Sequence, residues 1–190
     1  MLNPTPTILL HTSSYLYPMR IFLFLISLLF STMVWCQSDM PLDMSKTLME
    51  MQLEYLQPVE QSPKFIPAGK VKYFDYKFGL ELDNGSTLVL VQSKKDDGNY
   101  IPHMMISALV ATLATNNQDV KINMMSPADS YLKETNSDWA IEALFTPKDN
   151  IGEYGIAYLK SIFKEGVGVT NILYLAKTDV NIEPLLKYKN

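Results

Sequence analysis

The chain has 190 residues, 47% of them hydrophobic, and twenty Asp and Glu outnumber sixteen Lys and Arg to give a formal net charge of −4. This balance argues against general nucleic-acid binding, which depends on neutralising phosphates. Arg20 is the only arginine, so the rest of the chain lacks the bidentate fork that recognises phosphate, carboxylate and guanine. The lysines are spread along the chain, which is typical of a solvated surface.

The N-terminal region has the features of an export signal. Residues 21–35 are uncharged and apolar and follow Arg20 directly. This run is shorter than the roughly 20 residues of a membrane-spanning helix, but it fits the hydrophobic region of a signal peptide. We expect cleavage after Cys36, with Gln37 as the first mature residue. Residues 1–18 carry no charge, so Met1 and Met19 both remain open as the start.

Cys36 is the only cysteine, and it admits a second interpretation as the lipid-modified residue of a bacterial lipoprotein. That modification requires small residues before the cysteine, and Val34 and Trp35 fit poorly. We therefore expect a periplasmic or extracellular protein, with membrane attachment only if Cys36 is lipidated. Cleavage after Cys36 leaves no disulfide, no thiolate nucleophile and no cysteine metal ligand, so residues 37–190 must rely on an apolar core.

Residues 37–69 are expected to form a lead-in to the domain. Residues 42–56 show helical spacing of apolar side chains, with Met44, Leu48, Met51 and Tyr55 on one face. A methionine-rich stripe can bind other proteins, but packing on the chain's own domain is the commoner use, and we favour packing. Prolines then predict a loop; they are Pro58, Pro63 and Pro67.

The clearest strand signal lies in residues 74–82, where apolar and polar side chains alternate. Asn84 and Gly85 follow, a pair that accepts the positive φ angles of a tight hairpin, and residues 87–92 form the return strand. We expect antiparallel pairing. Residues 94–99 combine acids with glycine, but their spacing does not match a calcium loop, so we expect a solvated turn.

A helix is expected over residues 100–115, largely buried against the sheet. Its predicted buried face centres on Met105, Leu109 and Leu113, widened by Ile101, Met104, Ala108 and Ala111. A short strand is expected over 120–124. Ser126 then looks like an N-cap and Pro127 like the first residue of a short helix that ends near Lys133.

The C-terminal third is expected to be rich in strands. Residues 139–146 alternate like a strand that Pro147 closes. Residues 154–165 fit both a helix and a strand, and we favour a hairpin in which they pair with residues 169–176 through the turn at 166–168. Residues 181–188 are expected to form a short helix near Pro184. This order predicts an α+β fold with a mainly antiparallel sheet, packed helices and one domain over residues 70–190.

Candidate catalytic residues do not form a recognisable frame. His103 could act as a base for Ser93, Ser107 or Ser126, but no nucleophile elbow positions any of them, and a structural histidine is commoner. Residues 37–190 hold one histidine and no cysteine, which is a poor set of ligands for a transition metal.

Carboxylates and aromatic side chains are the alternative candidates for a site. Glu142 and Asp138 could act as the acid and base of a glycosidase, although Glu142 lies on the polar face of its strand and is expected to be exposed. Seven aromatic residues could line a sugar groove or simply pack; they are Tyr73, Tyr76, Tyr100, Trp139, Tyr154, Tyr158 and Tyr174. A glycine-rich phosphate loop is absent. The sequence thus assigns no catalytic, cofactor-binding or metal-binding residue.

Two resemblances add to these expectations. The signal that ends in Cys36 and Gln37, followed by a lysine-rich domain without arginine, resembles small exported proteins of Bacteroidota. The order of elements over residues 70–176 is similar to the PsbP/Mog1-like α/β sandwich, which implies a fold and no active site. We expect a non-catalytic envelope module that binds a protein or small ligand. The alternatives are a carboxylate-based hydrolase acting on glycans, and an assembly factor that docks through its methionine-rich N-terminal helix.

Overall fold

A computed structural model describes residues 40–56, 63–82, 85–98, 102–116, 123–148, 151–178 and 184–190. Residues Pro41–Asn190 form one compact unit. The predicted signal peptide and the ends of several predicted elements lie outside the described residues. Among the residues described, no helix has the length and apolar character needed to cross a membrane.

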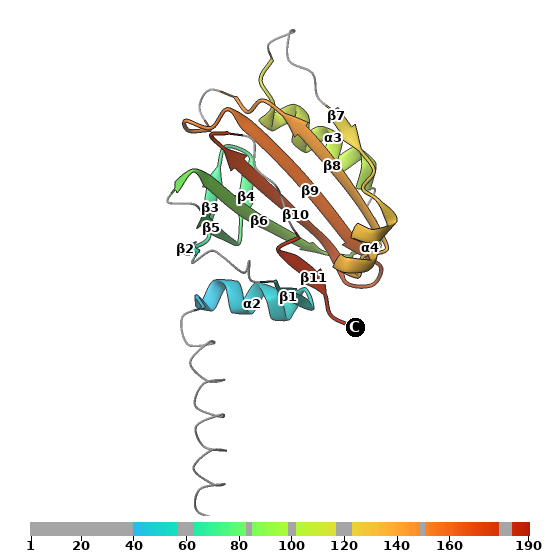
Figure 1. The fold of residues 1–190 in the computed structure, drawn as a ribbon. Coiled ribbons are helices and arrows are strands. Elements are labelled where there is room, and N and C mark those ends of the chain that lie inside the picture. Colours follow the sequence, from blue (N-terminus) through green and yellow to red (C-terminus); the bar gives the residue numbers. More distant parts are fainter. Residues whose placement is uncertain are drawn as a thin grey trace, which may run out of the picture. The chain divides into compact units, whose positions relative to one another are not determined.

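A seven-stranded sheet organises the unit, with the strand order β2-β5-β6-β10-β9-β8-β7 and antiparallel pairing throughout (Figure 1). The expected α+β fold with a mainly antiparallel sheet is therefore confirmed. The strands are β2 (Lys64–Ile66), β5 (Phe78–Leu82), β6 (Thr87–Lys95), β7 (Asn123–Met125), β8 (Trp139–Phe145), β9 (Ile156–Lys164) and β10 (Gly168–Ala176).

Helix α3 (Pro102–Leu113) covers one face of the sheet. Its residues Ile106, Val110 and Leu113 are buried in one apolar cluster with Leu159 of β9 and Leu173 of β10. A small hairpin of β3 (Gly69–Val71) and β4 (Phe74–Tyr76) adds Phe74 to this cluster. The main core thus lies between α3, this hairpin and the sheet.

A row of polar side chains crosses the same face. The Ser161 hydroxyl donates to Asn171 Oδ1 at 2.7 Å, and Asn171 Nδ2 donates to Gln92 Oε1 at 3.0 Å. Gln92 Nε2 in turn donates to the backbone carbonyl of Asp75 in β4 at 3.2 Å. These hydrogen bonds satisfy the polar groups and connect the β3–β4 hairpin to β9 across two intervening strands.

The opposite face is covered by α2 (Leu42–Glu50), α4 (Asp129–Thr135) and a two-stranded sheet of β1 (Leu53–Tyr55) and β11 (Leu186–Tyr188). Because strand side chains alternate, Lys160 and Thr170 point away from α3. The Lys160 ammonium lies over the Tyr131 ring of α4, and the Tyr188 hydroxyl donates to the Gly168 carbonyl at 2.9 Å. A second, smaller core therefore forms on this face.

The N-terminal helix is shorter than expected. It ends at Glu50, because Gln52 adopts φ 51°, and the chain continues as β1. The predicted stripe is nevertheless buried in its Met44, Leu48 and Met51 positions, which supports packing over docking for this face. The expected C-terminal helix is wrong for residues 186–188, which form β11 and pair with β1.

The predicted hairpins are confirmed with small changes. The strand over residues 74–82 splits at Lys77, because β4 pairs with β3 while β5 pairs with β2 and β6. The return strand β6 is longer than expected and reaches Lys95. The hairpin of β9 and β10 is also confirmed. Gly168 is required there, since a Cβ atom at its φ of 143° would collide with the Lys94 carbonyl oxygen.

The two helices of the central region differ from the predictions in detail. The buried face of α3 is formed by Ile106, Val110 and Leu113. The prediction is therefore confirmed for Leu113 and wrong for Met104 and Met105, which are 69% and 44% exposed. A helix that is apolar on all sides shows no pattern from which to choose the buried face. Helix α4 begins after Ala128 without a side-chain cap, so the predicted Ser126 cap is also wrong.

Candidate functional site

The most buried charged group among the described residues is Lys160, whose side chain is 8% exposed. It stands directly across from Glu142, because β8 and β9 pair these two positions. The ammonium lies 3.1 Å from Glu142 Oε1 and 4.7 Å from the centre of the Tyr131 ring of α4. The lysine is thus held by an ion pair and a cation–π contact.

Tyrosine side chains surround this pair. Burial raises the pKa of Tyr174 well above its usual value, and the negative charge of Glu142 adds to the shift. Burial and Glu142 raise the pKa of Tyr131 in the same direction. Both phenols therefore keep their protons across the physiological range, and they can donate hydrogen bonds but cannot act as bases.

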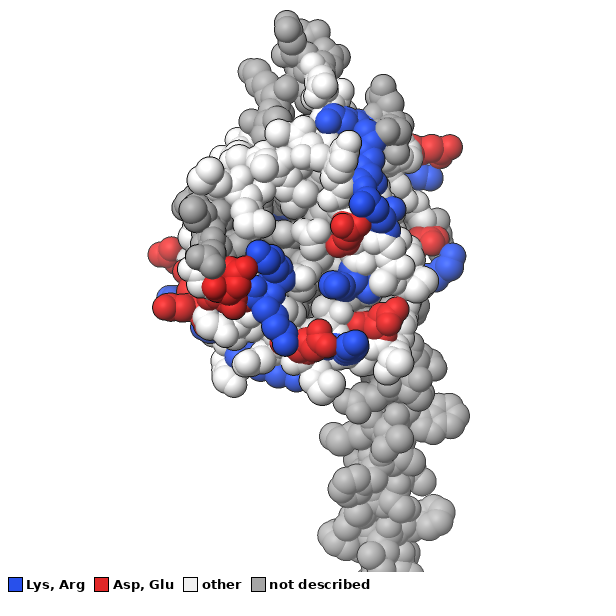
Figure 2. All heavy atoms as spheres, turned by 180° about the vertical axis from the view of Figure 1, so that it is seen from behind, with Lys and Arg blue, Asp and Glu red and all other residues white. Residues whose placement is uncertain are grey.

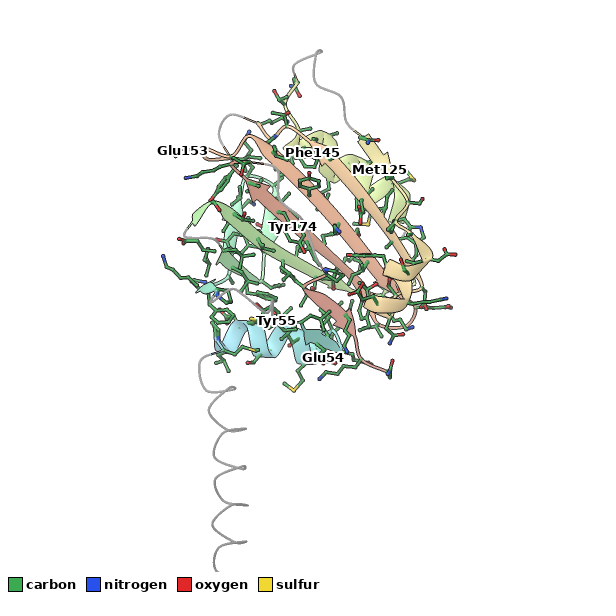
Figure 3. The ribbon with its side chains drawn as sticks, viewed as in Figure 1. Glu54, Tyr55, Met125, Phe145, Glu153 and Tyr174 are labelled. Atoms are coloured by element: carbon green, nitrogen blue, oxygen red, sulfur yellow. The ribbon has the colours of Figure 1, made fainter. Side chains whose placement is uncertain are left out.

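Tyr55 of β1 completes this group, which we call the tyrosine cluster: Tyr55, Tyr131, Glu142, Lys160 and Tyr174. Figure 3 labels Tyr55 and Tyr174, which belong to the side of the sheet opposite α3. The Tyr55 hydroxyl is buried and has no hydrogen-bond partner in the described part of the chain. A buried hydroxyl without a hydrogen-bond partner destabilises a folded protein. Within the cluster the Glu142 carboxylate and the Lys160 ammonium are paired with each other.

The structure corrects the sequence prediction for Glu142, which was expected to be exposed. Its side chain is 23% exposed and ion-paired, because α4 packs over this part of β8 and β9. The alternation of residues in β8 could not predict the partial burial of Glu142, because the covering helix α4 is a separate segment of the chain.

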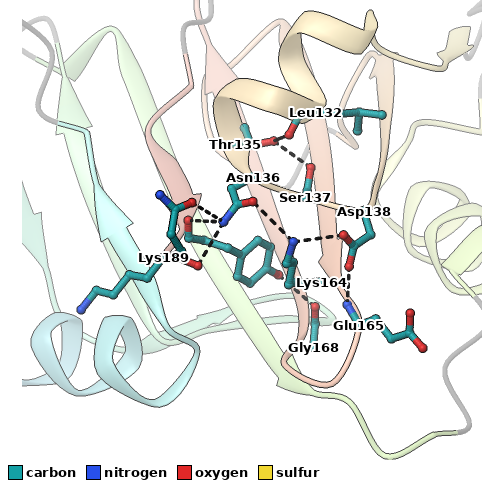
Figure 4. A network of polar contacts seen from close by, with 11 residues as sticks. Leu132, Thr135, Asn136, Ser137, Asp138, Lys164, Glu165, Gly168 and Lys189 are labelled. Carbon is teal, nitrogen blue, oxygen red and sulfur yellow. Dashed lines mark hydrogen bonds and ion pairs between the residues drawn. The ribbon is translucent and has the colours of Figure 1, made fainter.

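Asp138, the proposed partner of Glu142, belongs to a separate network (Figure 4). Its carboxylate accepts the Glu165 N–H at 2.8 Å and lies 3.0 Å from the Lys164 ammonium. The Glu165 N–H chiefly lowers the pKa of the Asp138 carboxyl, and Lys164 contributes. Lys164 also contacts Asn136, whose amide donates to the carbonyls of residues 188 and 189. This network fixes β11 against the turn after α4.

The structure does not bring Asp138 and Glu142 together. Four residues of extended chain separate their Cα atoms by about 13 Å, whereas the two carboxyl groups of a glycosidase lie roughly 5 to 9.5 Å apart. Each carboxylate is also paired with its own lysine. The arrangement therefore lacks the acid and base of a glycoside hydrolase.

The serine candidates are likewise dispersed. Ser93 contacts Thr170 at 3.3 Å on the sheet face away from α3, and Ser107 is exposed on α3 itself, so the sheet separates them. Ser126 is exposed before α4. His103 lies in α3, on the other side of the sheet from Ser93, and its side chain is outside the described residues. Ser107 follows His103 by four residues on α3, and the contact between these two side chains lies outside the described residues.

The aromatic candidates divide between the two faces. Tyr76, Trp139 and Tyr154 pack against the α3 core, whereas Tyr174 is buried on the opposite face. Tyr73 is 70% exposed at the turn of the β3–β4 hairpin, and Tyr100 lies outside the described residues. They do not line one common groove, and packing explains those that are buried.

One surface was missed by the sequence prediction. The outward side of α3, which we call the α3 outer face, comprises Met104, Met105, Ala108 and Ala111, all exposed. Helix α3 contains no Asp, Glu, Lys or Arg. In Figure 2, which views the α3 side, uncharged atoms occupy the upper left and the middle, and charged side chains lie on the right, in the lower part and at the left edge. The signal in the sequence was this absence of charge.

Metal binding and known relatives add no further assignment. Within the described ranges, no three His, Cys, Asp or Glu side chains group so that they could hold a metal ion. Comparison of the chain with protein-family models, with curated proteins and with solved structures finds no match.

Proposed function

We propose that this chain is an exported, non-catalytic binding module of the cell envelope, and that it docks a partner through the α3 outer face. Export is supported by the apolar run behind Arg20. The observation that carries the docking role is the exposure of Met104 and Met105, at 69% and 44%, on a helix without charged side chains.

The chemistry of this face favours binding. A helix that is hydrophobic on all sides is usually buried, yet α3 buries only the side that faces the sheet. Methionine side chains are flexible and polarisable, which suits them to contact surfaces. An uncharged centre with charged residues at its border is also the usual anatomy of a protein–protein interface.

The hydrolase alternative has less support. It required two convergent carboxylates, but Asp138 precedes β8 and Glu142 lies within it, and the two are paired with Lys164 and Lys160 respectively. The resemblance of residues 70–176 to the PsbP/Mog1-like sandwich stays a prediction and contributes no residue to the proposal. The resemblance to exported Bacteroidota proteins likewise concerns only the compartment.

The proposal is tested with the double variant Met104→Glu, Met105→Glu in the full chain. Both side chains are exposed, so the fold should survive, and the matched control is Met49→Glu, where an exposed methionine of α2 is replaced. Tagged chains are isolated from cross-linked envelopes of the native host, and associated proteins are quantified by mass spectrometry. We expect the double variant to lose its associated proteins while the control keeps them. Equal capture by both variants would refute the docking role of α3.

A further inference from the structure

We infer that α2, β1 and β11 form a lid over the sheet face opposite α3, and that this lid opens as one unit while the seven-stranded sheet and the α3 core stay folded. We call residues 42–56 and 185–190 the lid. The inference goes beyond the proposed function, because it does not involve the α3 outer face.

The two segments of the lid are joined to each other, although they lie at opposite ends of the described chain. Strand β1 pairs with β11 over three residues on each strand. The Leu56 N–H donates to the Leu185 carbonyl at 2.9 Å, and the Lys189 N–H donates to the Gln52 carbonyl at 2.7 Å. If one segment leaves the sheet, these hydrogen bonds carry the other with it.

The lid stands outside the hydrogen-bond ladder of the main sheet. Strands β1 and β11 form a sheet of their own (Figure 1), and among the described residues no backbone–backbone hydrogen bond connects the lid to the seven-stranded sheet. Strand β10, by contrast, pairs along its whole length with both β6 and β9. Opening of the lid therefore breaks no ladder of the main sheet, and such a segment can open at a lower free energy than the whole domain.

Two side chains fasten the lid at the end formed by β11. The Tyr188 hydroxyl lies 3.2 Å from the Ile162 carbonyl oxygen of β9 and 2.9 Å from the Gly168 carbonyl oxygen of β10. Asn136 Nδ2, at the end of α4, donates to the carbonyls of residues 188 and 189 at 3.1 and 3.0 Å (Figure 4). These hydrogen bonds exist only while the lid is closed, so they influence how often it opens.

Apolar packing keeps the lid closed at rest. Met44 and Leu53 of the lid are buried, and so is Ile172 of β10. Ile172 points away from α3, because the neighbouring Leu173 belongs to the α3 cluster and strand side chains alternate. Opening exposes this apolar surface to water, so the open state is a minor population. It presents an apolar sheet face that the closed molecule hides.

The α3 core provides the means to separate lid opening from unfolding of the whole domain. Its buried cluster contains Val110 of α3 and lies on the other face of the sheet, and no residue of the lid belongs to it. A change in this core lowers the free energy of global unfolding. It leaves the free energy of lid opening unchanged, because the α3 core stays intact when the lid is open.

The test is native-state hydrogen exchange of the full chain, followed by NMR under conditions in which exchange reports the opening equilibrium. The amides of Leu56 and Lys189 report the lid, one from each segment, and the amides of β10 report global unfolding. We expect the two lid amides to share one protection factor, at least about tenfold below that of β10. Clearly different protection factors for Leu56 and Lys189 would overturn the joint opening.

Two variants complete the test. Tyr188→Phe removes only the hydroxyl and should speed exchange of the lid and of β10 alike by about tenfold, because the open and the unfolded states both lack its hydrogen bonds. Val110→Ala should speed exchange of β10 by about tenfold and leave Leu56 and Lys189 unchanged. If Val110→Ala speeds the lid amides as much as those of β10, the lid opens only by global unfolding and the inference is wrong. If Tyr188→Phe leaves the lid amides unchanged, the hydroxyl does not fasten the lid.

Discussion

Replacing Lys160 by methionine should cost the domain about 2–3 kcal/mol of its free energy of unfolding. Methionine retains the length of the side chain but removes the charge, which leaves the Glu142 carboxylate without its partner at 3.1 Å. Removing one member of a buried pair typically costs about 3–5 kcal/mol. Glu142 is 23% exposed, so water can solvate part of its unpaired carboxylate. The expected loss in the free energy of unfolding is therefore smaller, at about 2–3 kcal/mol.

The assay is a double-mutant cycle measured by urea unfolding and thermal melting. For a domain of this size the loss corresponds to about 5–10 °C in Tm. The double variant Lys160→Met, Glu142→Leu removes both charges and should regain most of the loss, ending within about 1 kcal/mol of the parent. The matched control is Lys64→Met, because Lys64 forms a pair with Glu81 at 3.2 Å but is 75% exposed; its cost should stay below about 1 kcal/mol.

Two outcomes would refute this reasoning. If Lys160→Met were as stable as the Lys64→Met control, the pair would be hydrated in solution and its burial would carry no energetic weight. If the double variant were as unstable as the single one, the loss would come from packing of the lysine side chain and not from the orphaned carboxylate.

Three further predictions follow from features described above. Above pH 10 the unfolded chain loses tyrosine protons that Tyr131 and Tyr174 retain in the folded state. The free energy of unfolding should therefore fall by about 1.4 kcal/mol per pH unit for each tyrosine, as measured by urea titrations. An unchanged free energy of unfolding at pH 11 would contradict the burial of these phenols. Asn136→Gly should lower the free energy of unfolding by about 1–2 kcal/mol, because the hydrogen bonds to the C-terminal residues are lost. Asn136→Ala should cost about 1 kcal/mol more, because residue 136 has φ 49°. Calorimetry of both variants is the check, and equal melting temperatures would contradict the role of the backbone angle. Mass spectrometry of the mature protein should find its N-terminus at Gln37, whereas an intact N-terminus on cytosolic protein would refute export.

The strands that were predictable from the sequence are those whose alternation is long. Residues 74–82 and 139–146 alternate with a period of two, and turns with glycine precede β6 and β10, so the hairpins of β5 with β6 and of β9 with β10 could be expected. Among the three-residue strands, β1, β2, β3 and β11 were not predicted, because three residues are too few to show a period. They form only because a neighbouring strand supplies hydrogen bonds, which local sequence cannot indicate.

The candidate site was less predictable for a related physical reason. A polar position on a strand is exposed or buried according to what covers it, so Glu142 could not be assigned before α4 was placed over it. Helix α3 poses the reverse problem, because apolar residues on every side predict burial but not its direction. Only the structure distinguishes the side of α3 that packs on the sheet from Met104 and Met105, which are exposed.

The pairing of β1 with β11 has a consequence for the order in which the chain folds. Leu53 pairs with Tyr188, so the strand that follows α2 has no partner until residues 186–188 have been synthesised. Loop closure over such a distance is slow compared with the formation of local hairpins. A growing chain therefore stays incomplete on this face until residues 186–188 are available, and the smaller core between α2, β1 and β11 is the last part of the fold to close.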